Sequence, residues 1–226
     1  MLDAIKQKIE RKRGSKNIFW RFLLACKDSA FRLCRFLTAV FNRKGIFETI
    51  YKKNEWIYGS GENSLPENTV EYRKFLQKFL KDYEIKSVID VGCGDWQFSK
   101  FIDWSGINYV GVDIVKSVII KNKKEYEKEN IHFYCKDAVR YTLSEADLII
   151  IKDVLQHLSN KNVLKILRQL KKFKYVLLIN DFAEYNTDCR DGRYRALNLN
   201  GEPFNLNAQK ICNFNKTKVF FIKNGS

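Results

Sequence analysis

Metal-binding cysteine pairs and clustered histidines are missing from this chain. Its six cysteines are scattered without a Cys-x-x-Cys pair, and it contains two histidines, so we do not expect a structural zinc site. Proline is also rare, with two in 226 residues, while 30% of the residues are charged. This composition excludes a collagen-like or disordered chain, and the length suits one domain with an extension. The N-terminus lacks a short apolar core followed by a small-residue cleavage site, so we expect a cytoplasmic protein with reduced thiols.

Positive charge is concentrated at the start of the chain. Residues 1–44 contain 12 Lys and Arg against 3 Asp and Glu, so they carry +9 of the total net charge of +15. Within them, residues 18–42 predict one amphipathic helix with a wide apolar face, whose charged residues argue against a membrane span. Three interpretations stay open: a helix on an anionic membrane surface at the inner membrane face, a helix packed on a partner protein or a second copy, and a helix docked on its own core.

A glycine-containing segment follows this extension. We predict a linker over 45–64 that includes Gly59-Ser60-Gly61. Trp56, Tyr58 and this glycine loop are candidates for lid or acceptor contacts, or Trp56 and Tyr58 simply pack under the linker.

A helix is predicted after the linker, over 66–83, with Ser64 as a plausible N-cap. The chain is therefore divided into an N-terminal extension over 1–44, a linker or lid over 45–64 and a catalytic domain over 65–226.

The most informative segment is a short buried strand followed by a glycine turn. Residues 86–91 (KSVIDV) are mostly apolar and β-branched, Gly92 and Gly94 follow at once, and residues 96–104 can begin a helix. Strand, glycine turn and helix form the opening unit of a nucleotide-binding α/β sheet. Asp90 in this segment would repel a phosphate group but attract an ammonium group. No third glycine follows nearby, which disfavours a dinucleotide.

A second strand is predicted over 107–112, and it ends at Asp113. An acidic residue about 20 residues past the glycine turn is placed to accept both hydroxyls of a ribose. The string VIDVGCGDWQFSK, followed by YVGVDIV, therefore resembles the class I S-adenosylmethionine-dependent methyltransferases. Their first motif is a hydrophobic run, an acidic residue and Gly-x-Gly. The resemblance extends over about residues 64–224.

The resemblance implies an α/β fold, a Rossmann-like seven-stranded sheet with helices on both faces, preceded here by the amphipathic helix. Further strands are expected within 131–139, 146–158, 174–181 and 217–224, the last antiparallel between its neighbours. The implied cofactor is S-adenosyl-L-methionine, with S-adenosyl-L-homocysteine as the product. The expected cofactor-binding residues are Asp90 for the ammonium group, Gly92 and Gly94 for the carboxylate, Asp113 for the ribose, Ile114 and Asp137 for the adenine, and Lys152 near the sulfur.

Acidic and histidine side chains further along the chain are the catalytic candidates. Asp153 and His157 are four residues apart and are predicted to share a helix face. Such a pair could deprotonate an acceptor hydroxyl near neutral pH; alternatively, His157 packs near the cofactor and bonds to the backbone. Asn180 and Asp181 could join Asp153 in an oxygen-ligand Mg²⁺ site. Their order is the reverse of that in the metal-dependent O-methyltransferases, so no metal is expected.

The acceptor is a small molecule or a glycan in our interpretation. Arg190, Arg193 and Arg195 suit an anionic acceptor such as a phosphate or a uronate, or they form a solvated loop. No Pro-Pro or Pro-Cys pair is present, so motifs of many amino-methyltransferases and of the pyrimidine C5-methyltransferases are missing.

We therefore expect O-methylation of a sugar, glycolipid or other small hydroxylated acceptor. An RNA methyltransferase is the enzymatic alternative, and nucleic acid is less favoured because the basic residues interleave with apolar ones. A non-catalytic adaptor of the same fold, at a membrane or partner surface, is the alternative of another class.

Overall fold

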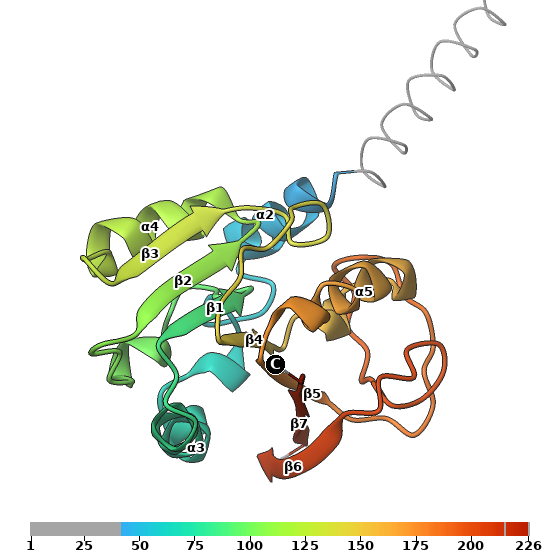
Figure 1. Ribbon diagram of the computed structural model, residues 1–226. Helices are drawn as coiled ribbons and strands as arrows, with labels where there is room; N and C mark the ends of the chain where they lie inside the picture. Colours follow the sequence, from blue (N-terminus) through green and yellow to red (C-terminus); the bar gives the residue numbers. More distant parts are fainter. Residues whose placement is uncertain (1–41, 215, 226) are drawn as a thin grey trace, which may run out of the picture. The chain divides into compact units, whose positions relative to one another are not determined.

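The computed structural model describes residues 42–214 and 216–225 (Figure 1). The amphipathic helix expected over 18–42 lies outside these residues, apart from Asn42. Residues from Lys44 onward belong to one unit of the chain. No helix in the described part is both long and apolar enough to cross a bilayer.

The described residues form a seven-stranded sheet in the order β3-β2-β1-β4-β5-β7-β6. Strands β1 to β5 pair in parallel, and β7 runs antiparallel between β5 and β6, as predicted. The sequence analysis does not predict β6, whose residues are at most partly buried. The strands are β1 (Ser87–Val91), β2 (Asn108–Asp113), β3 (Ile131–Cys135), β4 (Leu148–Lys152), β5 (Tyr175–Asp181), β6 (Gln209–Phe214) and β7 (Thr217–Lys223).

Four α-helices and five short 3-10 turns precede or connect these strands in the described part of the chain. The helices are α2 (Arg43–Lys53), α3 (Val70–Asp82), α4 (Lys116–Tyr126) and α5 (Asn160–Leu167). The 3-10 turns are η1 (Glu62–Ser64), η2 (Glu67–Thr69), η3 (Ser99–Phe101), η4 (Leu155–His157) and η5 (Leu170–Lys172).

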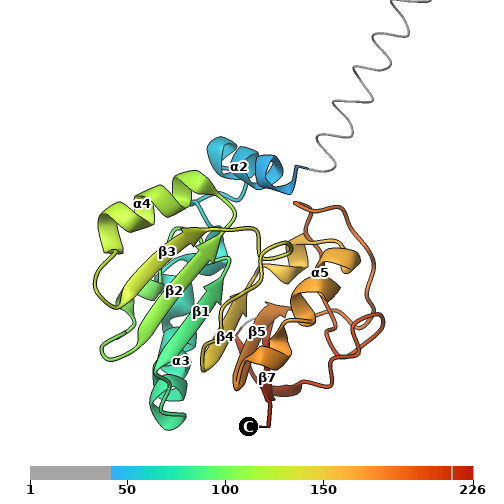
Figure 2. The same cartoon turned by 45° about the horizontal axis from the view of Figure 1, so that its top comes forward.

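Apolar side chains cover both faces of the sheet, as in parallel sheets that are buried on both sides. Leu148 and Ile150 of β4 belong to the cluster that includes α3, whereas Ile149 and Ile151 belong to the cluster that includes α5. Figures 1 and 2 show α3 and α5 on opposite sides of the strands. The carboxyl ends of β1 and β2 point toward α2 (Figure 2), and Phe47 and Ile50 of α2 join the cluster that includes α5.

The segment predicted as a linker or lid over 45–64 contains helix α2 at its start and η1 at its end. Two other local predictions are wrong. Ser64 does not cap α3, because its hydroxyl donates to the carbonyl of Ser60 (3.4 Å) and the helix begins six residues later. Residues 96–104 form only the 3-10 turn η3, because Trp96 has a left-handed backbone (φ 59°) that interrupts a helix at its start.

We predict that Gly111→Ala lowers the stability of the sheet. A Cβ at Gly111 in β2 would lie 2.8 Å from Phe133 Cδ1 and 3.0 Å from Cys93 Sγ, so the packed side chains would have to shift. We expect the free energy of unfolding in urea to fall by about 1–3 kcal/mol. Gly225→Ala is the matched control, since a Cβ there has no neighbour within 4 Å. Equal unfolding midpoints for the two variants would contradict the packing described for β2.

Candidate functional site

The turn after β1 requires glycine at two positions. Gly92 and Gly94 have φ angles of 74° and 54°, a region that side chains with a Cβ rarely occupy. A Cβ at Gly92 would lie 2.2 Å from Val154 Cγ2, and one at Gly94 would lie 2.3 Å from Ser60 Oγ. The backbone of this turn is therefore in direct contact with the segments that follow β4 and precede α3.

Asn122 of α4 holds the turn through a hydrogen bond. This residue is not predicted from the sequence. Its Nδ2 donates to the carbonyl of Gly94 (2.7 Å), and its side chain is fully buried. The sequence does contain a signal for this contact, because Asn122 follows Val118 and Ile119 at helical spacing on the buried side of α4. A polar residue at a core position usually has a specific hydrogen-bond partner.

Two buried carboxylates flank the turn. Asp113 accepts hydrogen bonds from the backbone N–H of Gly94 (3.1 Å) and of Val115 (2.8 Å). Asp90 accepts one from the hydroxyl of Tyr109 (2.7 Å). Burial raises the pKa of Asp90 and of Asp113 to about 6. Neither forms an ion pair with a described residue, so this edge of the sheet has negative charge available for a cationic or hydroxylated ligand.

A cover segment, residues 51–63, lies on the glycine turn. The hydroxyl of Ser60 donates to Asp95 Oδ1 (2.6 Å), accepts from the N–H of Asp95 (2.9 Å) and shares a hydrogen bond with the hydroxyl of Tyr51 (2.8 Å). Gln97 Nε2 donates to the carbonyl of Tyr58 (2.5 Å). The glycine loop that contains Ser60 is predicted from the sequence as a candidate for lid contacts, whereas Tyr51 is not predicted as a contact.

The aromatic candidates of the cover segment differ in position. Trp56 packs against Phe47, Tyr51 and the ring of His157, with ring centroids 6.0, 5.5 and 4.9 Å away. Tyr58 is 60% exposed. Trp56 therefore joins the cover to the segment after β4.

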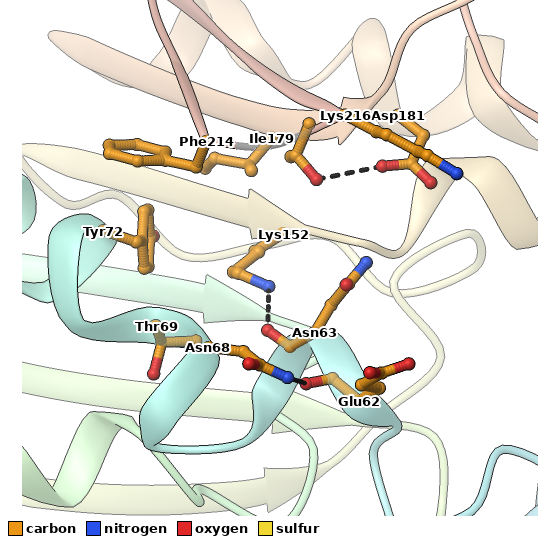
Figure 3. Close-up of a pocket in the computed structure, with 11 residues that line it drawn as sticks. Glu62, Asn63, Asn68, Thr69, Tyr72, Lys152, Ile179, Asp181, Phe214 and Lys216 are labelled. Atoms are coloured by element: carbon orange, nitrogen blue, oxygen red, sulfur yellow. Dashed lines mark hydrogen bonds between the residues drawn. The ribbon is translucent and has the colours of Figure 1, made fainter.

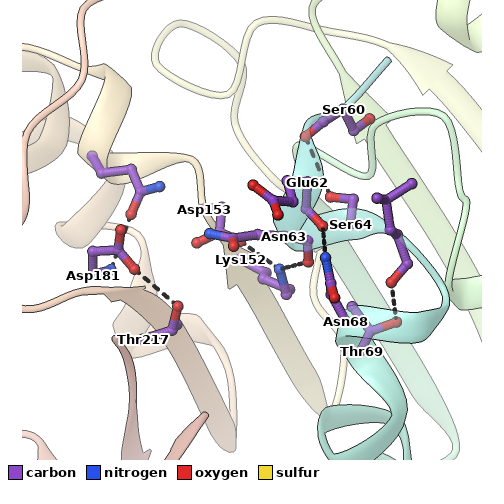
Figure 4. A network of polar contacts seen from close by, with 12 residues as sticks. Ser60, Glu62, Asn63, Ser64, Asn68, Thr69, Lys152, Asp153, Asp181 and Thr217 are labelled. Atoms are coloured by element: carbon purple, nitrogen blue, oxygen red, sulfur yellow. Dashed lines mark hydrogen bonds and ion pairs between the residues drawn. The ribbon is translucent and has the colours of Figure 1, made fainter. Parts of the chain in front are cut away.

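Lys152 links the end of β4 to the cover. Its ammonium donates to the carbonyl of Asn63 (3.0 Å) and pairs with the carboxylate of Asp153 (Figure 4). The ammonium also lies 5.7 Å from the ring centroid of Tyr72 and 5.5 Å from that of Phe98. Only 9% of the Lys152 side chain is exposed, so its charge is directed into the site rather than into bulk solvent.

Asp153 and His157 do not share a helix face, in contrast to the prediction. Asp153 has a left-handed backbone (φ 57°), His157 ends the 3-10 turn η4, and helix α5 begins only at Asn160. The His157 ring lies between Trp56 and Tyr194, whose ring centroid is 6.0 Å away. Burial lowers the pKa of His157, and the charge of Asp153 partly opposes this.

The two atoms that the pair would use have no partner in the described part of the chain. Nδ1 of His157 and Oδ1 of Asp153 are both buried without a hydrogen bond. Because burial lowers the pKa of His157, the neutral imidazole that can accept a proton is favoured.

A polar cavity of about 280 Å³ lies beside this cluster (Figure 3). Glu62, Asn63, Asn68, Thr69 and Tyr72 form one side, Lys152 lies between, and Ile179, Asp181, Phe214, Lys216 and Thr217 form the other side. The cavity thus joins the cover segment and the start of α3 to the carboxyl ends of β4 and β5.

Asp181 is fixed in this cavity by two hydroxyl groups. It accepts hydrogen bonds from Tyr194 (2.7 Å) and from Thr217 (2.9 Å). Partial burial and Asp181 raise the pKa of Tyr194 to about 12, so its hydroxyl stays protonated and donates. From the sequence, Asp181 is a candidate only for a metal ligand.

One of the three arginines predicted to face an anionic acceptor does not do so. Arg195 is 7% exposed, and its guanidinium donates to the carbonyl of Leu158 (2.5 Å) and to Asn160 Oδ1 (2.6 Å). It therefore stabilises the segment before α5 and is not directed at an acceptor. Arg190 and Arg193 are exposed.

The remaining expected cofactor residues follow β2 and β3. Asp137 accepts a hydrogen bond from the N–H of Val139 (3.0 Å) and lies 3.8 Å from Arg140 Nε, so it stabilises the turn after β3. Ile114 is partly buried against the core cluster that includes α5. Within residues 42–214 and 216–225, no group of three His, Cys, Asp or Glu side chains is placed to hold a metal ion.

Comparisons with known proteins agree with this geometry. Residues 88–174 match a family model described as a methyltransferase domain. The chain is 27% identical over 162 residues to phosphoethanolamine N-methyltransferase 1 of Zea mays, covering 66% of this chain but only 32% of the maize protein. The chain therefore spans about a third of that relative.

Two solved structures share the fold. Human N-acetylserotonin methyltransferase in complex with S-adenosylmethionine has a TM-score of 0.56 at 16% identity, covering 84% of this chain and 59% of the human chain. Magnesium protoporphyrin IX methyltransferase of Synechocystis PCC 6803, with bound S-adenosylhomocysteine, has a TM-score of 0.53 at 13% identity, covering 72% and 86% of the two chains. At these identities the similarity is one of fold.

We predict that His157 titrates below the ordinary histidine value of 6.5, because burial disfavours its charged form. The measurement is an NMR titration of the imidazole in a His132→Gln background, which leaves one histidine. Asp153→Asn should lower the midpoint further, since the negative charge of Asp153 favours the imidazolium. Asp82→Asn, which removes a carboxylate paired with Lys78 on the surface of α3, is the control and should have no effect. A midpoint at or above 6.5 would contradict the described environment.

Proposed function

We propose that this chain, whose residues 88–174 form a methyltransferase domain of the class I S-adenosylmethionine-dependent family, transfers the methyl group of S-adenosylmethionine to a small hydroxylated acceptor. The resemblance predicted from the sequence is confirmed by the family match and by the fold. The observation that supports the placement of the cofactor is the pair of buried carboxylates, Asp90 and Asp113, beside the glycine turn.

In this proposal, each carboxylate receives a different part of the cofactor. Asp90 pairs with the ammonium group of the methionine moiety, because a buried carboxylate without a cation is stabilised by one. Asp113 accepts the ribose hydroxyls, while its bonds to Gly94 and Val115 hold the carboxylate in place. Gly92 and Gly94 allow the cofactor to approach the backbone of the turn.

Three further residues complete the proposed cofactor site. Ile114 packs on the adenine, and Asp137, at the turn after β3, is the candidate for the adenine amino group. Lys152 ends β4 next to the glycine turn, because Asp90 pairs with Ile150 across the sheet, and it is our candidate for a position near the cofactor sulfur.

Methyl transfer from a sulfonium needs little beyond positioning. A lone pair of the acceptor oxygen attacks the methyl carbon, the carbon–sulfur bond breaks, and its electron pair remains on the sulfur of S-adenosylhomocysteine. His157 is our proposed base for the hydroxyl proton, with Asp153 stabilising the imidazolium. Tyr194 contacts both the His157 ring and Asp181, so this base lies one side chain away from the wall of the cavity.

An amine acceptor is the second candidate. The maize relative is named as a phosphoethanolamine N-methyltransferase, and an amine would also suit a site bordered by carboxylates. The two candidates share the cofactor site and differ only in the group that occupies the cavity.

We expect Asp113→Ala to weaken the binding of S-adenosylmethionine and of S-adenosylhomocysteine by more than about tenfold, because hydrogen bonds to two ribose hydroxyls are lost. Isothermal titration calorimetry on the full chain measures this directly. Asp103→Ala is the control, since Asp103 stabilises only an exposed turn through the N–H of Ser105 (2.9 Å). Undiminished affinity in Asp113→Ala would remove the ribose assignment, and no binding by the folded wild-type protein would overturn the proposed activity.

We also expect the affinity for S-adenosylmethionine to rise with pH between about 5 and 7. Burial places the pKa of Asp90 at about 6, so below that pH the carboxyl must lose a proton before it can pair with ammonium. The rise should approach about tenfold per pH unit at the acidic end. Methylthioadenosine, which lacks the ammonium group but keeps the ribose proposed for Asp113, is the matched ligand and should show a smaller rise, because only the ionisation of Asp113 affects it. Equal pH dependence for the two ligands would contradict the role of Asp90.

A further inference from the structure

We propose that the 280 Å³ cavity is the acceptor subsite and that it takes a single polyhydroxylated ring, such as one monosaccharide unit, with Asp181 accepting a hydrogen bond from a ring hydroxyl. This inference rests on the proposed function and specifies the acceptor class and its anchoring residue.

The cavity shares Lys152 with the proposed cofactor site. Lys152, which lies next to the glycine turn, separates the two walls of the cavity (Figure 3). Tyr72 lines the same cavity, and the charge of Asp90 reaches it, since burial and then Asp90 raise the pKa of Tyr72. An occupant of the cavity would therefore lie beside the methionine end of the cofactor.

The lining has the chemistry that a sugar ring needs. Asn63 and Asn68 offer amide groups, and the rings of Tyr72 and Phe214 offer apolar surface. The hydroxyl groups of Thr69 and Thr217 donate to Leu65 and to Asp181, so they offer only their oxygen atoms as acceptors. The hydroxyl of Tyr72 is buried and has no partner among the described residues; its side chain is 2% exposed. A buried polar group without a partner costs free energy that a ligand hydroxyl would recover. The volume is at the small end of ligand sites, which start near about 300 Å³, so one ring fits better than a polymer.

Asp181 is the side chain best suited to anchor such a ring. Tyr194 and Thr217 fix its carboxylate from two sides, and it forms no ion pair with a described residue. Each carboxylate oxygen can accept a further hydrogen bond, and a hydroxyl donating to a carboxylate makes a strong, oriented contact. Lys152 does not neutralise Asp181, because its ammonium is engaged by Asp153 and by the carbonyl of Asn63.

The test is saturation-transfer NMR on the full chain saturated with S-adenosylhomocysteine. The probes are glucose, galactose and glucuronate as sugars, ethanolamine and phosphoethanolamine as amines, and a short single-stranded RNA. We expect transfer to at least one sugar and an apparent affinity at least about tenfold weaker in Asp181→Asn. Asp82→Asn, the same change on the surface of α3, should leave the signals unchanged.

Controls separate this inference from the proposed function. Calorimetry with S-adenosylhomocysteine checks that Asp181→Asn is folded, and Thr217→Val is the second variant, which removes one of the two hydrogen bonds that fix Asp181 and should weaken the sugar signals less. If S-adenosylhomocysteine binds but only amines or RNA give signals, or none of the probes does, the sugar proposal is overturned and the methyl donor site stands. Equal sugar affinity in Asp181→Asn would overturn the anchoring role. If S-adenosylhomocysteine does not bind, both proposals fail.

Discussion

The N–H of Gly94 donates to the carboxylate of Asp113 (3.1 Å) and ties the glycine turn after β1 to the end of β2. Asn122 holds the same residue from α4 through its carbonyl, and the hydroxyl of Ser60 lies over it from the cover segment. The turn is thus fixed from three directions by polar groups that come from three different elements. The arrangement of the cofactor edge follows from this, because the cover segment is positioned by the turn and in turn closes one side of the cavity.

Electrostatic strain accompanies this arrangement. Asp90 and Asp113 are both buried, and the charge of Asp113 adds to burial in raising the pKa of Asp90. A core built only for stability would avoid two nearby carboxylates without cations. The protein retains them at one edge of an otherwise apolar sheet, which is where a bound cation or a pair of hydroxyls would relieve the cost. Functional sites commonly lower the stability of the free protein, and ligand binding then compensates for this cost.

The sequence predicts the parts of the fold that depend on short-range patterns. The apolar, β-branched runs at β1, β2, β4 and β5 predict the strands, and the glycine spacing predicts the turn, because these signals are contained in a few residues. The parts that fail depend on contacts between distant residues. Trp96 and Asp153 adopt left-handed backbone conformations that no local propensity indicates, so the two helices expected there do not form. From the sequence, Arg195 is predicted to be a surface charge. It is instead buried, with hydrogen bonds to Leu158 and Asn160, which lie more than thirty positions earlier in the chain. Ser60 and Asp181 acquire their roles only when the chain is folded.

The contact between Lys152 and the carbonyl of Asn63 affects how ligands enter and leave the site. The cover segment is attached to the sheet by this bond, by Ser60 with Asp95 and by Gln97 with Tyr58, and the ring of Trp56 adds packing against His157. The polar contacts are individually weak and can be exchanged for water. A ligand seated at the glycine turn would leave only when these contacts open, so the lifetime of the spent cofactor on the protein would be set by the hold of the cover segment. Turnover would then be paced by the opening of a short segment rather than by the chemical step.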